Sequence, residues 1–480
     1  MKKSLRSMAT VAVATIGLTA VSMPAFAAQG DGKSGDLDLK TATATVNMGG
    51  STFDQPLIAV QTGNLIVSGV KAYGGANTKV TVSPNPYPTS GSNSGSGYGR
   101  NAVTNNAGGF LATIGFSDQP MASASGTVPS GVTVSDYAQV PFLLGGAVMT
   151  YNVPGVSNLK LTPAVIAEIY DGAITSWKNP QIIALQGGAA STNGKILNAL
   201  SSSEEQIKVA FRSGGGGTNY AFENYLYDAY QANKTANSSC TANFALSTGT
   251  TTINGNKVAN QKPATGVDVT ASCYWPGSVP QTLWGKQMDY TYNNAPLWDN
   301  APNLDTARGT SYTKGVQSGN GGMVTYVENN VGAIGYVEAS YVLLANDPAL
   351  QVAQLPNAQT HKFIKFSVNG VIAAAANKLA SGAINTDDFD INNQADAAGK
   401  AWPFATFSWA IVPKNSNGSG AQSATNLEAG VKYIDWATHA GQKFASAVGY
   451  APLPVSVQNA VRNSLNNVMC GATACLAVTH

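Results

Sequence analysis

Short apolar runs alternate with turns rich in Gly, Ser, Asn and Thr along most of the chain. Their composition and length predict strands at 42–48, 79–83, 112–116, 140–152, 209–211, 332–337 and 404–412. Apolar residues recur at helical spacing over 161–170, 222–229, 430–440 and 455–465. Because strands and helices alternate, the pattern predicts an α/β fold with long polar loops.

The first 27 residues differ from the rest of the chain. Three basic residues precede an apolar run over 8–23, and Pro24 then leads into Ala25-Phe26-Ala27. This order is typical of a cleaved secretory signal peptide, and the run is short for a membrane span, although an uncleaved anchor is the alternative. No Cys lies near the cleavage site. We therefore predict a signal peptide at 1–27, no lipid anchor, and a periplasmic or secreted protein.

The charge balance argues against a polyanionic partner. Removing Lys2, Lys3 and Arg6 from the 27 Lys and Arg leaves 24 basic against 25 acidic residues, a net charge of −1. Charged residues are only 11% of the chain. A nucleic acid needs several phosphates neutralised, and a membrane surface needs a basic or amphipathic segment. The composition therefore favours a small ligand held by a few placed groups.

Size and cysteine content point to an exported protein of more than one domain. The roughly 450 residues after the signal peptide exceed one core. The polar stretch at about 233–308 looks like an insertion and holds two of the four cysteines. Proximity favours Cys240–Cys273 and Cys470–Cys475, although three pairings are possible. The three histidines are scattered and no zinc-type spacing occurs, so we predict structural cysteines and no metal site.

Several small-residue turns follow predicted strands and precede predicted helices. Unpaired N–H groups at a helix start, together with the helix dipole, can hold an anion. In the turn over 212–219, Arg212 offers a charged fork and Thr218 a hydroxyl donor, and Thr52 offers another hydroxyl in the turn over 49–53. A flexible turn is the simpler explanation for an isolated glycine run such as Gly214–Gly217, and no Gly-Lys-Ser/Thr follows it as in a P-loop.

Asp118 follows the predicted strand at 112–116. A carboxylate beside an anion normally repels it, but it can accept a hydrogen bond from an anion that carries a proton. Monohydrogen phosphate carries this proton near neutral pH and sulfate does not, so such an Asp would select phosphate. A turn or helix-cap Asp is the alternative, and only the combination with the other turns favours the anion site.

In combination, these segments resemble the periplasmic phosphate-binding proteins of ABC importers. The matching segments occur in the order of that family and span most of the chain after the signal peptide: 50–53, 94–99, 117–120, 144–148, 152–155, 161–170, 172–174, Trp177, 212–218, 331–338 and the helices from 431 onward. The resemblance implies a two-lobed, type II periplasmic-binding fold. It places the first lobe at 41–150 plus 405–480 and the second at 151–404, with the disulfide-containing insertion in the second.

The resemblance also implies a set of ligand-binding residues. These are Thr52, Phe53 through its backbone, Ser96 within a residue or two, Asp118, Arg212, Gly217 and Thr218. The family usually has an acidic residue two positions after the arginine and a Ser two further on, where this chain has Gly214 and Gly216. The first replacement removes a partner of Arg212, and the second removes a hydroxyl donor. Backbone amides of the glycines can replace the donor but not the acid.

The function implied is binding of inorganic phosphate, or of a related oxyanion such as arsenate or a phosphonate, by a monomer that serves an ABC importer. No cofactor and no catalytic residue is expected. One alternative is a diverged secreted phosphatase of the kind associated with DING-like relatives, acting on phosphomonoesters. The chain shows no nucleophile with an evident base and no metal-ligand cluster to support it. A surface adhesion protein on the same scaffold is a further alternative.

Overall fold

The computed structural model describes thirteen stretches of the chain. They are 44–62, 80–83, 94–104, 111–119, 121, 133–170, 174–212, 217–236, 250–253, 256–259, 313–381, 391–418 and 422–476. The predicted signal peptide, the Cys240–Cys273 pair and almost all of the predicted insertion lie outside these residues.

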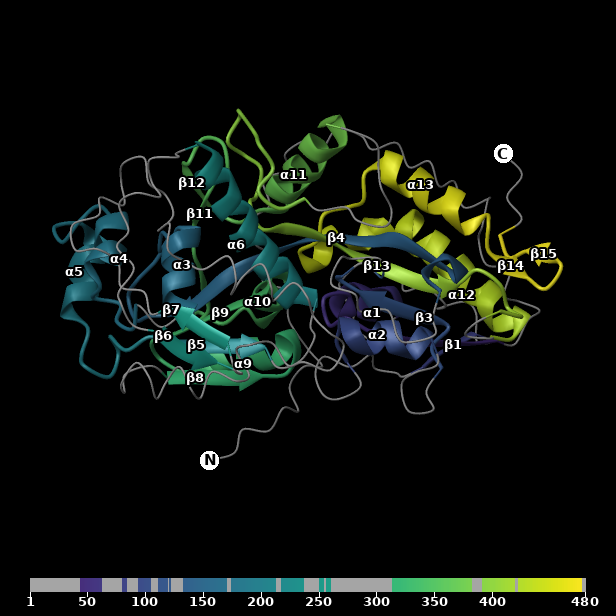
Figure 1. The fold of residues 1–480 in the computed structure, drawn as a ribbon, viewed down its shortest axis with the longest axis horizontal. Helices are drawn as coiled ribbons and strands as arrows, with labels where there is room; N and C mark the ends of the chain where they lie inside the picture. Colours follow the sequence, from purple (N-terminus) through teal and green to yellow (C-terminus); the bar gives the residue numbers. More distant parts are fainter. Residues whose placement is uncertain are drawn as a thin grey trace.

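The described strands form one large mixed sheet that runs through the whole molecule (Figure 1). Its order is β2 (Val80–Ser83), β1 (Ala44–Gly50), β3 (Ile114–Ser117), β13 (Ala405–Pro413), β4 (Tyr137–Asn152), β9 (Ala333–Glu338), β5 (Lys208–Arg212) and β8 (Thr313–Gln317), with β10 (Gln351–Val352) also paired to β4. Strands β1, β2 and β3 are parallel to one another, and so are β5, β8 and β9.

Strand β4 joins two halves of this sheet. Its first part, Tyr137–Gly146, pairs antiparallel with β13, and its second part, Ala147–Asn152, pairs antiparallel with β9. We call the strands from β2 to β13 the first half and those from β9 to β8 the second half. All sixteen residues of β4 are buried, as expected from a run with apolar side chains on both faces. A continuous hydrophobic core extends through both halves.

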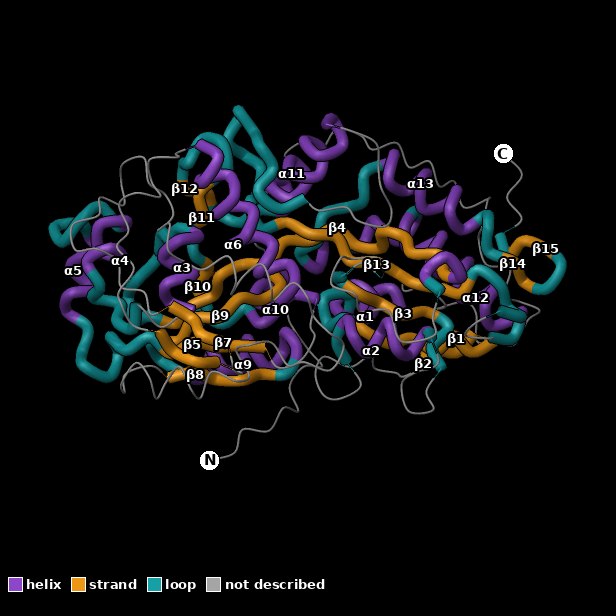
Figure 2. Tube along the Cα trace, in the orientation of Figure 1, coloured by secondary structure: helices purple, strands orange, loops and turns teal. Residues whose placement is uncertain are grey.

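Helices surround both halves of the sheet (Figure 2). The first half is packed by α1 (Gln55–Thr62), α2 (Ser96–Val103), α12 (Ala424–Thr438) and α13 (Val455–Leu465), with the short 3-10 helices at Val134–Asp136, Ala440–Phe444 and Ser446–Val448. The remaining helices are α3 (Pro163–Tyr170), α4 (Pro180–Leu185), α5 (Thr192–Ala199), α6 (Gly217–Ala236), α9 (Gly319–Asn329), α10 (Ala339–Ala345) and α11 (Val368–Ser381). Hairpins add β6 (Thr250–Ile253) with β7 (Asn256–Ala259), β11 (Leu355–Pro356) with β12 (Phe363–Ile364), and β14 (Met469–Cys470) with β15 (Thr473–Ala474).

The α/β class and the two-lobed architecture are confirmed. Every strand predicted from the apolar pattern coincides with an observed strand within a few residues, and the helix at 455–465 has the predicted bounds. One local difference is that residues 96–99, for which the sequence analysis predicts no helix, form the first turn of α2. Gly99 permits this helix to lie against the backbone of β3, because a Cβ there would be 2.1 Å from the carbonyl oxygen of Phe116. The predicted lobe boundaries stay a prediction.

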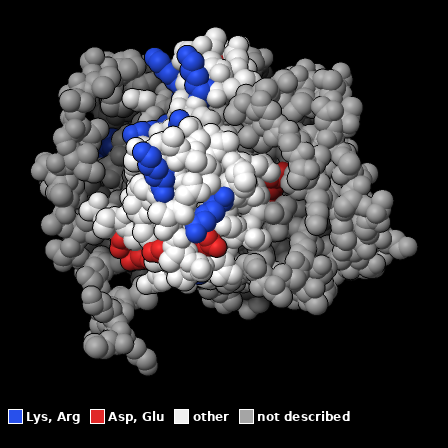
Figure 3. Space-filling model, turned by 90° about the vertical axis from the view of Figure 1, so that its left-hand side faces the viewer, with Lys and Arg blue, Asp and Glu red and all other residues white. Residues whose placement is uncertain are grey.

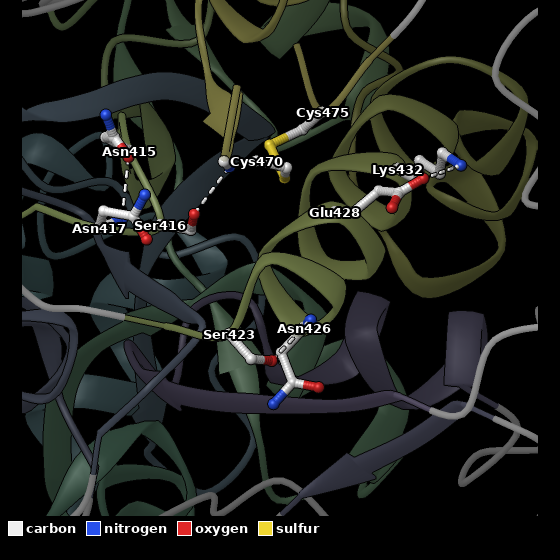
Figure 4. Close-up of a disulfide and its surroundings, with 10 residues drawn as sticks. Asn415, Ser416, Asn417, Ser423, Asn426, Glu428, Lys432, Cys470 and Cys475 are labelled. Carbon is white, nitrogen blue, oxygen red and sulfur yellow. Dashed lines mark hydrogen bonds and ion pairs between the residues drawn. A yellow bond between two sulfur atoms is a disulfide. The ribbon is translucent and has the colours of Figure 1, made fainter. Parts of the chain in front are cut away.

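A disulfide closes the hairpin at the C-terminal end, as proximity predicted (Figure 4). Cys470 and Cys475 are bonded, and Ser416 Oγ accepts a hydrogen bond from the Gly471 N–H at 2.9 Å. The Met469 N–H donates to the Lys414 carbonyl, so the hairpin is attached to the end of β13.

The surface carries few charges, in keeping with the composition. Viewed from the end of the second half, Lys and Arg side chains appear as separate spots among uncharged atoms (Figure 3). Among the described residues, no helix combines the length and apolar character needed to cross a bilayer.

Candidate anion-binding site

Four helix N-termini meet where the two halves of the sheet face each other. Strand β1 leads into α1, β5 precedes α6, and β8 leads into α9, while α2 begins at Ser96. Ser96 Oγ accepts hydrogen bonds from the backbone N–H of Gly217 and of Asp118, both at 3.0 Å. Thr52 Oγ1 accepts from Asn320 Nδ2 at 3.1 Å. Helix starts from both halves therefore lie around one point, where their dipoles favour negative charge.

Arg212 is the cation of this site. It ends β5, is 2% exposed, and donates from Nη1 to Thr218 Oγ1 and from Nη2 to Thr52 Oγ1 at 3.4 Å. Burial lowers the pKa of Arg212, while the charge of Asp118 acts in the opposite direction. Because arginine keeps its proton at any physiological pH, the site holds a permanent buried positive charge.

The hydroxyls around Arg212 are oriented to donate. Thr52 Oγ1 receives N–H groups from Asn320 and Arg212, and Thr218 Oγ1 receives one from Arg212. A hydroxyl has two lone pairs and one proton, so an oxygen that already accepts from fixed donors directs its own proton elsewhere. The site thus presents O–H donors as well as positive charge, which is the combination that an oxyanion requires.

Asp118 lies directly beside these donors. It is fully buried, its Oδ1 accepts from Ser408 Oγ at 2.9 Å, and its Oδ2 has no hydrogen-bond partner among the described residues. That oxygen faces the start of α6, since a Cβ on Gly217 would lie 2.7 Å from it. Burial raises the pKa of Asp118, and the Ser51 hydroxyl and the Arg212 charge oppose the rise.

Two further buried acids were not found from the sequence. Asp54 stands at the start of α1, and its Oδ2 lies 2.7 Å from Ser408 Oγ, within hydrogen-bond distance. Glu338 ends β9, and neither of its carboxyl oxygens has a partner within the described residues. Burial raises the pKa of each well above its ordinary value, and the charge of Asp118 adds to the rise. Asp54 directly follows the segment at 50–53 and Glu338 is the last residue of the segment at 331–338, both singled out in the sequence analysis, and this was the available signal.

Asn320 and Ser408 also belong to the site and were missed. Asn320 lies in a strand–glycine turn–helix pattern, Gln317-Ser318-Gly319-Asn320, of the kind that had drawn attention to the turn over 212–219. Ser408 is a polar residue inside the fully buried strand β13. A polar side chain in a buried strand needs hydrogen-bond partners, but the sequence does not show which residues they are.

Most of the predicted ligand-binding residues are brought together. Hydrogen bonds join Arg212 to Thr52 and Thr218 in one group and Ser96 to Asp118 and Gly217 in a second. The two groups meet because Gly217 directly precedes Thr218 and the charges of Arg212 and Asp118 influence each other. Phe53 lies next to them, but its N–H donates to Ser51 Oγ at 2.9 Å and its ring is buried against Tyr450. Gly214 and Gly216 lie outside the described residues. The role of each residue in ligand binding stays a prediction.

The described residues contain no group of three or more His, Cys, Asp or Glu side chains arranged to hold a metal ion.

Comparison with known proteins identifies the scaffold. The PBP superfamily domain matches residues 40–440. The chain belongs to the PBP superfamily. Among curated members, the phosphate-binding protein PstS of Xylella fastidiosa (strain Temecula1) is 26% identical over 72% of this chain and 69% of its own length. PstS of Methanocaldococcus jannaschii is 26% identical over 78% of this chain and 77% of its own length. The resemblance inferred from the sequence motifs is therefore confirmed.

Two solved structures, of a phosphate-binding protein and of a DING protein, share the fold. The ancestral soluble variant of the human phosphate-binding protein has a TM-score of 0.50 and 16% identity, and the match covers 90% of this chain and 98% of that one. A DING protein also has a TM-score of 0.50, with 15% identity and coverage of 87% and 93%.

Proposed function

We propose that this chain binds inorganic phosphate between the two halves of the molecule, as the solute-binding protein of an ABC-type phosphate importer. The observation that carries the proposal is the buried pair of Arg212 and Asp118 among the hydroxyls of Thr52, Thr218 and Ser96 at four helix starts. The relatives named phosphate-binding protein PstS support the same ligand.

The charges of the site favour a protonated oxyanion. Arg212 and the O–H donors attract the anion, whereas Asp118 repels one that has no proton to share. Monohydrogen phosphate can donate its proton to Asp118 Oδ2, which has no other partner among the described residues. Sulfate at neutral pH cannot, so the site discriminates between two anions of similar size.

The location of this function follows from the N-terminal sequence. The basic start, apolar run and small-residue end over 1–27 support cleavage of a signal peptide and export to the periplasm or beyond. A mature, monomeric protein would then deliver phosphate to a membrane importer.

Calorimetric titration of the mature, phosphate-stripped protein with phosphate tests the proposal, with sulfate as the competing anion. We expect saturable phosphate binding with one site and no measurable sulfate binding at neutral pH. Arg212→Lys keeps the charge but loses the two-pronged donor, and we expect phosphate affinity to fall by about tenfold or more. Lys432→Ala, which removes a cation from the exposed side of α12, is the matched control.

A phosphomonoester assay on the same sample addresses enzymatic activity. Steady release of phosphate from the ester would favour the phosphatase alternative. Absence of phosphate binding by the wild-type protein would refute the proposal, and unchanged binding by Arg212→Lys would refute the assignment of the site.

A further inference from the structure

One hydroxyl lies between two buried carboxyl groups behind the anion site. Ser408 Oγ is 2.7 Å from Asp54 Oδ2 and 2.9 Å from Asp118 Oδ1. The three residues come from different elements: Asp54 from the start of α1, Ser408 from β13, and Asp118 from the end of β3. All three are fully buried.

The number of protons constrains this arrangement. A serine hydroxyl has a single proton, so it donates to one carboxyl group and must accept from the other. Two ionised carboxylates would leave one Ser408 contact without a proton, with two like charges close together in a buried environment. One of the two acids is therefore protonated, and the open question is which.

The surroundings assign the proton to Asp54. Asp118 has the Arg212 charge nearby, the Ser51 hydroxyl, and the Ser96 side chain that also accepts its backbone N–H. Asp54 has Ser408 as its side-chain partner, and its Oδ1 has none among the described residues. The start of α1 favours a negative Asp54, but burial and the charge of Asp118 act in the opposite direction and dominate.

The other titratable groups near Asp54 reinforce this assignment. Glu338, Tyr341 and Tyr450 are buried, and the charge of Asp54 raises the pKa of all three. None of these three groups supplies a positive charge. Arg212 is the cation that acts on Glu338 and Asp118, and its charge lowers the pKa of both.

We propose that Asp54 is a neutral positioning residue: it donates its proton to Ser408, which donates to Asp118 and so keeps Asp118 ionised as the acceptor. This inference rests on the proposed phosphate function for its consequence, which is selectivity. An ionised Asp118 rejects an unprotonated anion, whereas a neutral Asp118 would not. The direction of the hydrogen-bond chain therefore decides whether sulfate is excluded.

Variants of the chain test this direction. Asp54→Ala removes the donor to Ser408, and we expect the ratio of phosphate to sulfate affinity to fall by about tenfold, the effect of one lost charge-assisted hydrogen bond. Asp54→Asn supplies an N–H in place of the carboxylic O–H. It should therefore keep most of the wild-type ratio of phosphate to sulfate affinity. Ser408→Ala interrupts the chain without changing the start of α1, so it should lower the ratio as Asp54→Ala does.

Infrared difference spectroscopy locates the proton without any ligand. Glu338 is a second buried acid with a raised pKa, so the spectra are recorded in a Glu338→Gln background. In that background we expect the carbonyl stretch of a protonated carboxylic acid to be present at neutral pH, to disappear on addition of Asp54→Asn, and to persist on addition of Asp118→Asn. Loss of this band in Asp118→Asn instead would overturn the proposal, as would an Asp54→Asn protein no more selective than Asp54→Ala. If wild-type protein binds no phosphate but the band still follows Asp54, the proposed function fails while the position of the proton stands.

Discussion

At the scale of single residues, the site balances one buried cation against three buried acids. Arg212 is surrounded by Asp118 and Glu338, and Asp54 lies behind them, all fully buried. Isolated buried charges are costly, and an acid without a counter-charge takes up a proton instead. The charge state of the site therefore depends on how protons are distributed among these acids.

The protonation state of Asp118 makes the selectivity between phosphate and sulfate depend on pH. Burial raises the pKa of Asp118, so its carboxylate becomes neutral at a higher pH than an exposed Asp does. Neutral Asp118 no longer repels sulfate, which stays fully ionised. We expect sulfate to compete increasingly well with phosphate as the pH falls from about 8 toward the ordinary range of a carboxylic acid near 4. Competition titrations over this range measure the effect, and a sulfate affinity that is independent of pH would contradict it.

Gly217 is expected to tolerate no side chain. A Cβ at this position would lie 2.4 Å from both Asp118 Cβ and Ser96 Oγ. Overpacking of this kind costs about 1–3 kcal/mol, so Gly217→Ala should weaken phosphate binding by roughly 10- to 100-fold in a calorimetric titration.

Gly322→Ala in α9 is the matched control, because its nearest contact would be an ordinary 3.5 Å to Gln317 Cβ. Equal affinities of the two variants would show that the start of α6 can move away from Asp118.

The sequence is sufficient to find site residues that belong to a recognisable motif. It does not reveal residues whose role comes from contacts with distant parts of the chain. Thr52, Asp118 and Arg212 were found because each belongs to a turn that resembles a known family. Asp54 and Ser408 contact each other over a separation of 354 residues, and no local pattern encodes such a contact. Sequence reasoning could predict an anion site, but not the buried acids that set its proton content.

At the scale of elements, α12 and α13 are joined by an ion pair between a partly exposed arginine and a buried aspartate. Arg462 of α13 donates to Asp435 of α12, with Nε 2.8 Å from Oδ1 and Nη2 3.1 Å from Oδ2. Asp435 is 1% exposed, so water cannot replace Arg462 as its partner. The His439 ring nitrogen Nδ1 lies 2.7 Å from the Asp435 carbonyl, and burial lowers the pKa of His439. Arg462 is therefore the main counter-charge.

Removing Arg462 should destabilise the first half. Arg462→Ala leaves Asp435 buried without its partner, and we expect the free energy of unfolding to fall by about 3 kcal/mol in denaturant titrations. The double variant Asp435→Leu with Arg462→Met replaces both charges by apolar groups. Its free energy of unfolding should fall by less than that of Arg462→Ala. If the double variant proved the less stable of the two, the ion pair itself would be stabilising.

The C-terminal hairpin contributes less to the stability of the protein than the pair of Arg462 and Asp435 does. The disulfide closes a loop with a sequence separation of 5, so it restricts the unfolded chain only modestly. Replacing Cys470 and Cys475 by Ser should lower the free energy of unfolding by about 2 kcal/mol. Phosphate affinity should be unchanged because the hairpin is attached to the end of β13, away from Ser408. A large loss of affinity would reveal a connection through that strand.

At this scale the apolar pattern was sufficient to place the elements. The long apolar run over 140–152 was predicted as a strand, and β4 covers it, is fully buried and joins the two halves of the sheet. The extent of α2 was not predicted, because glycines that usually mark a turn serve here to let the helix approach Phe116. Such a close approach is a property of the packed structure rather than of the local sequence.

At the scale of the whole molecule, hydrogen bonds connect the two halves across the site. Tyr341 of α10 donates from Oη to the Thr52 carbonyl at 2.6 Å, and Ser96 accepts from Gly217. A contact of this kind exists only while the halves are together, so it adds to ligand binding by favouring the closed arrangement.

Tyr341→Phe tests the contribution of this contact. It removes one hydrogen bond between the halves and no contact to the ligand, so we expect phosphate affinity to fall by about tenfold or less, as for one net hydrogen bond. Tyr326→Phe, on α9, is a control that removes a phenolic hydroxyl elsewhere in the same half. A larger loss in the control would mean that Tyr341 has no special part in closure.

The position of β13 bears on how this chain can be made and exported. It is the last long strand in the sequence, yet it fills the gap between β3 and β4, whose residues precede it by more than 250 positions. A nascent chain that ends before residue 405 therefore has two open strand edges where its sheet should be continuous, and open edges recruit other chains. Folding of the first half must wait until almost the entire polypeptide is available. The proposed export requires a chain that is still unfolded while it is threaded through a membrane, and this topology postpones completion of the sheet until the end of the chain arrives.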